Sequence, residues 1–348
     1  MKNYLPVIYA LLAALLFGIN VPFSKLLVKE INPLFLAALL YLGAGLGMFI
    51  IDSRRKYQKH PLTEARLTRK EMPSVIMMIL LDTAAPIFLI TGISMTNSST
   101  AALLGNFEIA ATSLIAMIFF REAVGKRLWL AIGLISLASI MLTIGDTASL
   151  NISAGALFVL LSCLCWGFEN NCTRNLSHKD PLQVVIIKGW GSGLASLIIA
   201  CTWGDLAAKF LYIVLALVLG FVAYGLSIFF YVSAQRELGA ARTSAYYAAA
   251  PFVGVVLSWI LLQESISTSF LIALAIMLLG AYFALTEKHE HEHVHLRETH
   301  EHRHNHNDVH HNHSHYPEIA GEHSHEHAHE EMEHKHTHMP ELHHRHLH

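Results

Sequence analysis

Two similar stretches decide the fold, "LLFGINVPFSKLLV" (residues 15–28) and "LCWGFENNCTRNLS" (residues 164–177). Aligning them places Gly18 on Gly167, and further along both stretches a hydroxyl side chain is followed by a basic one. Because the two stretches lie about 150 residues apart, the pair indicates a duplicated sequence.

Composition places the chain in a membrane. Of the 348 residues, 53% are hydrophobic and only 14% are charged, whereas about a quarter of the residues of an average soluble protein are charged. The apolar residues gather into blocks of about twenty, the length at which a helix crosses a hydrocarbon layer about 30 Å thick. The alternating pattern of a membrane barrel is missing, so helices must pair the backbone groups in lipid. The apolar stretch after Lys2 is too long for a cleaved signal and is interpreted as the first span.

We predict ten membrane helices, at residues 5–28, 33–51, 73–94, 98–120, 127–145, 152–174, 181–203, 208–234, 241–262 and 267–285. Most connections are very short, which makes neighbouring helices antiparallel and adjacent. The first repeat of five spans then covers residues 1–145 and the second covers 146–287. Because five is odd, the second repeat enters the membrane in the opposite sense. The predicted fold is an all-α membrane protein of two inverted five-helix repeats, followed by a disordered His-rich tail over residues 288–348.

The charges between the spans predict the orientation. If the N-terminus is in the cytoplasm, the inner connections carry the following basic residues: Arg54, Arg55, Lys56, Lys59, Arg66, Arg69, Lys70, Arg121, Lys126, Arg127, Arg174, Lys179, Arg236 and Arg242. The outer connections carry little beyond Lys29 and Lys209. Because basic residues favour the cytoplasmic side, we expect a multi-pass protein of the plasma (inner) membrane with both termini in the cytoplasm.

A second pair of motifs, "FFREAV" and "LLQESI", places Glu122 on Glu264 near the end of each repeat. With these motifs, from about residue 5 to residue 286, the chain resembles the EamA-type members of the drug/metabolite transporter superfamily. The resemblance rests on "FGIN" and "WGFEN" in the opening helices, on the small residues of the fourth and ninth helices, on Pro251, and on the two glutamates.

The resemblance implies transport of small organic solutes, often by export or exchange. It also implies a central cavity lined by the first, third, fourth, sixth, eighth and ninth helices. One departure matters, because the fourth helix reads "GNFEIAATS" and lacks a counterpart of Pro251. The substrate of relatives therefore does not carry over to this chain.

Polar and ionisable side chains within the spans mark the candidate site, because a charge at the centre of a bilayer costs at least about 2.5 kcal/mol. The candidates are Asn20, Asp82, Asn106, Glu108, Glu169, Lys188 and Tyr246. We expect Asp82 and Glu108 to bind a substrate cation or a proton, and the asparagines and Glu169 to complete the polar surface. For Lys188 and Glu169 the alternative is a buried ion pair that only holds helices together.

Small residues predict where helices pack closely. They form the patterns Gly43-x-Gly45-x-Gly47, Gly189-x-Gly191-x-Gly193 and Ala248-Ala249-Ala250. Glu122 and Glu264 close helices at the membrane interface, so we expect them to cap or gate rather than to bind substrate.

The segment from His289 onward has another chemistry, since 23 of its 60 residues are histidine and its other charges are mostly acidic. Without an apolar core it is expected to be disordered when empty. Imidazole binds Zn, Ni, Co or Cu near neutral pH, and His-x-His suits an extended chain while pairs four apart suit a helix. Candidate ligands are His291, His293, His302, His304, His313, His315, His323, His325, His327, His329, His336 and His338. The alternatives are a pH-responsive polyelectrolyte and an expression tag, although tags are uninterrupted repeats.

These features predict a secondary-active transporter, in the first place an exporter, that moves a small metabolite by alternating access and carries a cytoplasmic metal-binding tail. The alternative is a divalent transition-metal exporter (Ni, Co or Zn) whose tail collects or senses the ion. An intramembrane enzyme is not indicated, because no span contains histidine and no convincing Ser/Lys pair is present. The expected partners are a small-molecule or ion substrate and the lipid bilayer, with no nucleic acid and no required cofactor. The oligomeric state is left open.

Overall fold

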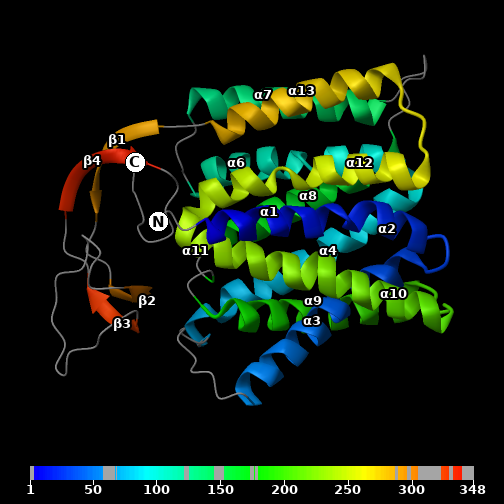
Figure 1. Cartoon of the computed structure of the whole chain (residues 1–348), viewed down its shortest axis with the longest axis horizontal. Coiled ribbons are helices and arrows are strands. Elements are labelled where there is room, and N and C mark those ends of the chain that lie inside the picture. The colour runs from blue at the N-terminus through cyan, green and yellow to red at the C-terminus, as the bar shows by residue number, and fades with distance from the viewer. Residues whose placement is uncertain are drawn as a thin grey trace.

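A computed structural model describes residues 4–57, 67, 69–120, 125–144, 153–172, 176, 179–286, 289–295, 299–304, 323–328 and 332–338. They form a bundle of long helices, followed by four short strands (Figure 1).

The first half of the chain contains α1 (Leu5–Gly18), α2 (Asn20–Leu27), α3 (Pro33–Tyr57), the 3-10 turn η1 (Arg69–Glu71), α4 (Met72–Met95), α5 (Ser98–Leu104), α6 (Phe107–Phe120) and α7 (Lys126–Ile144). The second half contains α8 (Ala154–Cys172), α9 (Pro181–Trp203), α10 (Phe210–Gly220), the π-helical turn η3 (Phe221–Leu226), α11 (Ser227–Tyr247), α12 (Ala250–Leu262) and α13 (Thr268–Leu285). Among the described residues, seven helical stretches are long and apolar enough to cross a membrane, and α12 and α13 are shorter apolar helices.

Prolines explain where two of the helices are interrupted. A proline has no N–H and cannot donate to the carbonyl four residues earlier. Pro22 thus leaves the carbonyl of Gly18 without its helical partner, and α1 ends at Gly18. Pro251 does the same for Tyr247, where α11 ends. Interrupted spans of this kind are typical of the binding regions of transporters.

The predicted connection between the spans at 208–234 and 241–262 differs from the structure. We predicted a loop there, whereas α11 continues without interruption to Tyr247 and α12 begins at Ala250. The reason is local, because the residues between the two predicted spans include no proline and only one glycine, Gly239, whereas Pro251 forces a break further on.

Helix packing has the arrangement of two related halves. The contacts between the two halves include those of α3 with α9, α4 with α8, α1 with α11, α7 with α13 and α5 with α12. In the numbering of the predicted spans, these pairs are 2 with 7, 3 with 6, 1 with 8, 5 with 10 and 4 with 9. When five is added to each span number, and the count starts again at 1 after 10, the same set of pairs results. A two-fold relation between inverted repeats requires this. The predicted fold class, an all-helical membrane body of this type, is confirmed.

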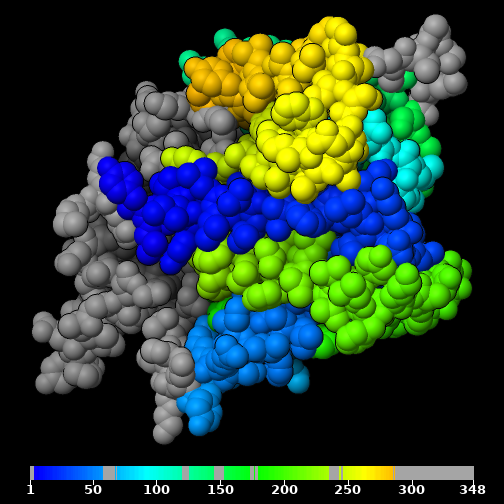
Figure 2. All heavy atoms as spheres, turned by 45° about the vertical axis from the view of Figure 1, so that its right-hand side comes forward, coloured from blue at the N-terminus to red at the C-terminus, as the bar shows by residue number. Residues whose placement is uncertain are grey.

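Each pair of successive antiparallel spans returns the chain to the end of the bundle where the pair began. Figure 1 accordingly shows the start of α1 and the end of α13 at one end. In Figure 2, α1 and α2 form a band across the surface, between α12 on one side and α10 on the other. The first repeat is therefore in contact with the second along its whole first span.

Glycines allow α3 and α9 to approach closely, as predicted. A Cβ on Gly45 would lie against the backbone of Gly189 and Trp190, and a Cβ on Gly189 would meet the backbone of Gly45. In contrast, a Cβ on Gly133 of α7 would meet nothing within 4 Å. The α3–α9 contact therefore depends on the absence of side chains.

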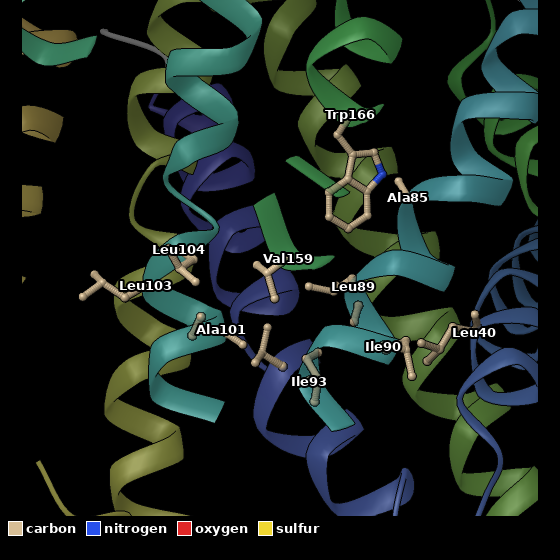
Figure 3. Close-up of a cluster of buried hydrophobic side chains, with 14 of the residues drawn as sticks. Leu40, Ala85, Leu89, Ile90, Ile93, Ala101, Leu103, Leu104, Val159 and Trp166 are labelled. Atoms are coloured by element: carbon tan, nitrogen blue, oxygen red, sulfur yellow. The ribbon is translucent and has the colours of Figure 1, made fainter. Parts of the chain in front are cut away.

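Apolar side chains fill the space between α4, α5 and α8. Figure 3 shows Leu89 and Ile93 of α4 beside Ala101 of α5 and Val159 of α8. All four side chains are buried.

Four segments of the tail are extended strands, β1 (His289–His295), β2 (Thr299–His304), β3 (His323–Ala328) and β4 (Met332–His338). β1 pairs with β4 and β2 with β3, both antiparallel. The His-x-His pattern thus occurs here in extended backbone, the register that suits it. In the β1–β4 ladder, His289, His291 and His293 are opposite His338, His336 and His334.

Candidate functional site

A buried ion triad lies where the two repeats meet. Lys188 Nζ of α9 is 3.1 Å from Asp82 Oδ2 of α4 and 3.0 Å from Glu169 Oε1 of α8. Asp82 is fully buried, and Glu169 and Lys188 are less than a tenth exposed. One lysine is shared by two carboxylates, one from each repeat, so the formal charge of the triad is −1.

Two tyrosines extend the triad towards the first span. The hydroxyl of Tyr41 on α3 donates to Asp82 Oδ1 at 2.9 Å, and its ring lies 5.1 Å from the ring of Tyr224 in η3. The Tyr224 hydroxyl accepts from Asn20 Nδ2 at 3.0 Å, and Asn20 Oδ1 accepts from Ser24 at 3.0 Å. A polar path thus runs from α2 to α9 through the apolar interior.

Glu108 belongs to a neighbouring polar group. Asn170 Nδ2 of α8 donates to Glu108 Oε1 of α6 at 2.8 Å. Glu108 lies within electrostatic range of Glu169 and Lys188, so the two groups adjoin through α8. Asn106 occupies the break between α5 and α6, where its amide donates to the Leu103 carbonyl. Its buried Oδ1 has no hydrogen-bond partner among the described residues, which makes it an available acceptor.

The local sequence places Asp82 at an irregular point of α4. Pro86 lies inside this helix and, lacking an N–H, cannot pair with the carbonyl of residue 82. The backbone and the side chain of Asp82 therefore both offer acceptor atoms in the apolar interior. Such freed backbone groups are tolerated in membranes where they face protein or a polar cavity.

At one end of the bundle, Glu264 joins the two repeats. It follows α12 and accepts from the backbone N–H of Ser98 at 2.7 Å and of Ser99 at 2.8 Å, at the start of α5. It also accepts from the Ser99 hydroxyl at 2.5 Å. Nearby, Ser98 Oγ and Ser258 Oγ are 2.7 Å apart. We call this contact the α5 clamp, and it agrees with the prediction that Glu264 caps a helix.

Lys25 strengthens the same end of the bundle. Its Nζ donates to the carbonyls of Ile93 at 2.6 Å and Thr96 at 2.5 Å, at the end of α4. A cation is favourable at the carboxyl end of a helix because the last carbonyls carry partial negative charge. Lys25 therefore ties the first span to α4 rather than facing the triad.

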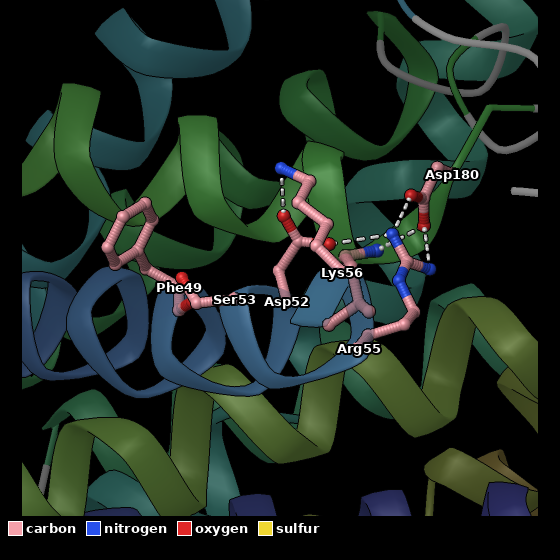
Figure 4. Close-up of polar contacts among 7 residues, drawn as sticks. Phe49, Asp52, Ser53, Arg55, Lys56 and Asp180 are labelled. Atoms are coloured by element: carbon pink, nitrogen blue, oxygen red, sulfur yellow. Dashed lines mark hydrogen bonds and ion pairs between the residues drawn. The ribbon is translucent and has the colours of Figure 1, made fainter. Parts of the chain in front are cut away.

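At the opposite end, α3 is tied to α9 by charged side chains (Figure 4). Arg55 Nη2 is 2.6 Å from Asp180 Oδ2 and 2.7 Å from Asp52 Oδ1. Asp52 also pairs with Lys56 at 2.6 Å, and Asp180 caps α9 by accepting from the N–H of Leu182. We call this contact the α3–α9 clamp. The triad therefore lies between two clamps, each of which joins one repeat to the other.

The structure brings most of the predicted site residues together. Asp82, Glu169 and Lys188 are in direct contact, Asn20 joins them through the tyrosines, and Glu108 adjoins them. Tyr246 is not part of the cluster, because it is 37% exposed. Its neighbour Tyr247 packs inward instead, with its ring 4.9 Å from that of Tyr231.

Sequence reasoning missed Tyr41, which holds Asp82 directly. The cavity that the resemblance implies does not include the second span, which contains Tyr41. A lone tyrosine hydroxyl in the middle of the apolar stretch "FLAALLYLGAG" was the available signal, because a hydroxyl in lipid needs a partner.

Metal ligation has no support from the helices that the structure describes, where no three His, Cys, Asp or Glu side chains are grouped as a metal site. In the tail, His302 is opposite His325 in the β2–β3 ladder and His291 is opposite His336 in the β1–β4 ladder. Three predicted ligands, His313, His315 and His329, lie outside the described residues, as does Glu122.

Comparison with known proteins gives three findings. The EamA-like transporter family matches the chain twice, over residues 5–144 and 153–286. An uncharacterized transporter of Methanothermobacter thermautotrophicus (strain Delta H) is 27% identical over 287 residues, which cover 78% of this chain and 83% of that protein. A protein crystal structure superposes with a TM-score of 0.59 at 15% identity, over 82% of this chain and 96% of the other, which supports the fold alone.

Proposed function

Because the chain belongs to the EamA-like transporter family, we propose that it is a secondary-active exporter of a small organic solute and works by alternating access. The observation that carries the proposal is the Asp82–Lys188–Glu169 triad, buried where α4 of one repeat meets α8 and α9 of the other. Ionisable groups are expensive in the middle of a membrane and are retained there for a function. We also propose that the first repeat covers residues 1–145 and the second covers residues 146–287.

The two clamps support alternation. The α5 clamp closes one end through Glu264, and the α3–α9 clamp closes the other through Arg55 and Asp180. In transporters built from inverted repeats, one repeat rocks against the other around a central site. Opening either clamp while the other stays closed would expose the triad to one side at a time.

The charge pattern favours an organic solute over a bare metal ion. Lys188 already neutralises part of the charge of Asp82 and Glu169, so a divalent cation would have to displace a buried ammonium group. A solute with its own amine and acceptor atoms can exchange partners with the triad one contact at a time. Asn106 Oδ1, which lacks a partner among the described residues, offers a further acceptor. We therefore prefer a small amine-bearing or zwitterionic metabolite as cargo.

The loop charges support an orientation with both termini in the cytoplasm of a plasma-membrane protein. Arg54, Arg55 and Lys56 then lie on the inner side, at the end of α3. In this orientation, the α3–α9 clamp is the inner closure and the α5 clamp is the outer closure.

The tail is proposed to bind a divalent transition metal in the cytoplasm. The supporting observation is the register of the ladders, which pairs His289, His291 and His293 with His338, His336 and His334. Residues opposite one another and two apart share one face of a ladder, and imidazole is a common ligand of Zn, Ni and Cu. Titration of the full chain with Zn²⁺ should show binding that disappears when residues 289–348 are deleted. Unchanged Zn²⁺ binding after this deletion would remove the tail from the proposal.

Transport itself is tested by comparing culture media. Cells that overproduce the protein should accumulate particular small amines or zwitterions outside. Cells producing Asp82→Asn should lose this accumulation, whereas cells producing Glu30→Gln, a change at an exposed position, should keep it. The proposal fails if Asp82→Asn, present in the membrane at the normal level, exports as well as the unchanged protein. A metal-sensitivity screen run in parallel tests the alternative, since a metal exporter would instead change tolerance to Ni, Co or Zn.

A further inference from the structure

A recess along α3 lies outside the site described above. It has a volume of about 430 Å³ and is lined by Phe49, Ile50, Ser53, Arg54 and Tyr57. It lies at the end of α3 that carries the basic residues, away from the triad. The transport proposed above does not involve the recess, so a role for the recess has to be inferred separately.

The five lining residues form a single face of the helix. Phe49 and Ser53 are four residues apart, and Ile50, Arg54 and Tyr57 follow one another at spacings of four and three, which places the side chains next to one another along α3. The face is apolar at Phe49 and Ile50, which are about half exposed, and polar at Ser53, Arg54 and Tyr57. Polarity thus changes along the helix axis in the way that it changes from the acyl chains to the headgroups of a bilayer.

Arg54 differs from its two basic neighbours. Arg55 pairs with Asp52 and Asp180, and Lys56 pairs with Asp52 (Figure 4). Among the residues that the structure describes, no carboxylate is within ion-pair distance of Arg54. Its guanidinium is exposed at the polar end of the recess, so an anionic partner is available only from outside the described chain.

The donors in the recess are limited. The Ser53 hydroxyl already donates to the Phe49 carbonyl at 2.8 Å, which leaves its oxygen as an acceptor. Arg54 and the Tyr57 hydroxyl remain as donors. Guanidinium binds phosphate oxygens well because several N–H groups point the same way, and tyrosine is frequent at the headgroup level of membranes.

We propose that this recess binds an anionic glycerophospholipid. The lipid phosphate lies on Arg54 and the Tyr57 hydroxyl, and one acyl chain lies along Ile50 and Phe49. A headgroup hydroxyl can donate to Ser53 Oγ. Because the recess is independent of the triad, this inference stands or falls separately from the proposed transport.

The test is lipid retention in native mass spectrometry. The purified full chain in neutral detergent is mixed with dioleoyl phosphatidylglycerol or, separately, dioleoyl phosphatidylcholine. We expect the unchanged protein to retain phosphatidylglycerol at least five-fold better. We expect Arg54→Gln to lower this retention about five-fold, as one basic residue near a membrane surface is worth about 1 kcal/mol. Tyr57→Phe is expected to lower it about two-fold.

Two controls identify the ligand. Arg69→Gln removes an exposed positive charge next to α4 and should leave phosphatidylglycerol retention unchanged. Inorganic phosphate should not displace the lipid. The proposal is overturned if Arg54→Gln retains phosphatidylglycerol normally, if Arg69→Gln loses it equally, if phosphatidylcholine binds as well, or if free phosphate competes. Since Arg54 is exposed, the variant should melt at the normal temperature without lipid, and Tyr57→Phe provides a second, milder variant.

Discussion

Replacing Lys188 by methionine separates a transport role of the triad from a purely structural one. The substitution leaves Asp82 and Glu169 buried without their shared cation. Asp82 is fully buried and Glu169 is 3% exposed, so solvent cannot replace the ammonium group. Breaking a buried ion pair by removing one partner costs roughly 3–5 kcal/mol. We therefore expect the melting temperature of Lys188→Met in detergent to fall by roughly 10 °C, together with loss of transport.

The informative variant is the neutral triple, Lys188→Met with Asp82→Asn and Glu169→Gln. It contains no unpaired charge, and the Tyr41 hydroxyl that now donates to Asp82 Oδ1 at 2.9 Å can still donate to an asparagine oxygen. Replacing a buried ion triad by neutral side chains of similar size is often neutral or stabilising. The melting temperature should return to within about 3 °C of the unchanged protein, while transport stays at least 100-fold reduced. A stable triple variant that still transports would refute the reasoning, since the triad would then only hold helices.

Three further predictions concern the clamps and the helix packing. Glu264→Gln removes the charge that accepts three hydrogen bonds at α5. A cysteine probe introduced by Ser258→Cys should then react at least ten-fold faster with an impermeant maleimide added outside. An unchanged rate would contradict the α5 clamp. Arg55→Gln opens the other clamp and should slow the same reaction, whereas a faster reaction would mean that the clamps do not alternate. Gly189→Ala places a Cβ against the backbone of α3 and should destabilise the protein by about 1–3 kcal/mol. The control Gly133→Ala should be neutral or slightly stabilising. Equal melting temperatures of the two variants would contradict close packing at Gly189.

The helical body could be predicted from the sequence because lipid leaves few alternatives. Apolar blocks of about twenty residues must be helical, and two similar stretches in opposite halves imply the two-fold arrangement. The place of each helix break was harder to predict. It depends on single prolines such as Pro22 and Pro251, and the loop predicted before Pro251 is instead a continuation of α11.

The candidate site could be predicted in its charges but not in its contacts. A charge in an apolar span stands out in any sequence, so Asp82, Glu169 and Lys188 were found. Their pairing depends on how α4, α8 and α9 are rotated, and hydropathy does not determine rotation. For the same reason Tyr246 was chosen instead of its neighbour Tyr247, since one residue along a helix turns the side chain by about 100°.

Alternating access around the buried polar path is tested most directly by a single cysteine at Ser24. This side chain is fully buried and bonded to Asn20, and serine to cysteine is a small change. The four native cysteines, which are all free thiols, are first replaced by alanine. We predict that a membrane-impermeant maleimide modifies the new cysteine slowly from outside in intact cells and slowly from inside in inverted vesicles. Modification from one side only, or from neither, would contradict the account.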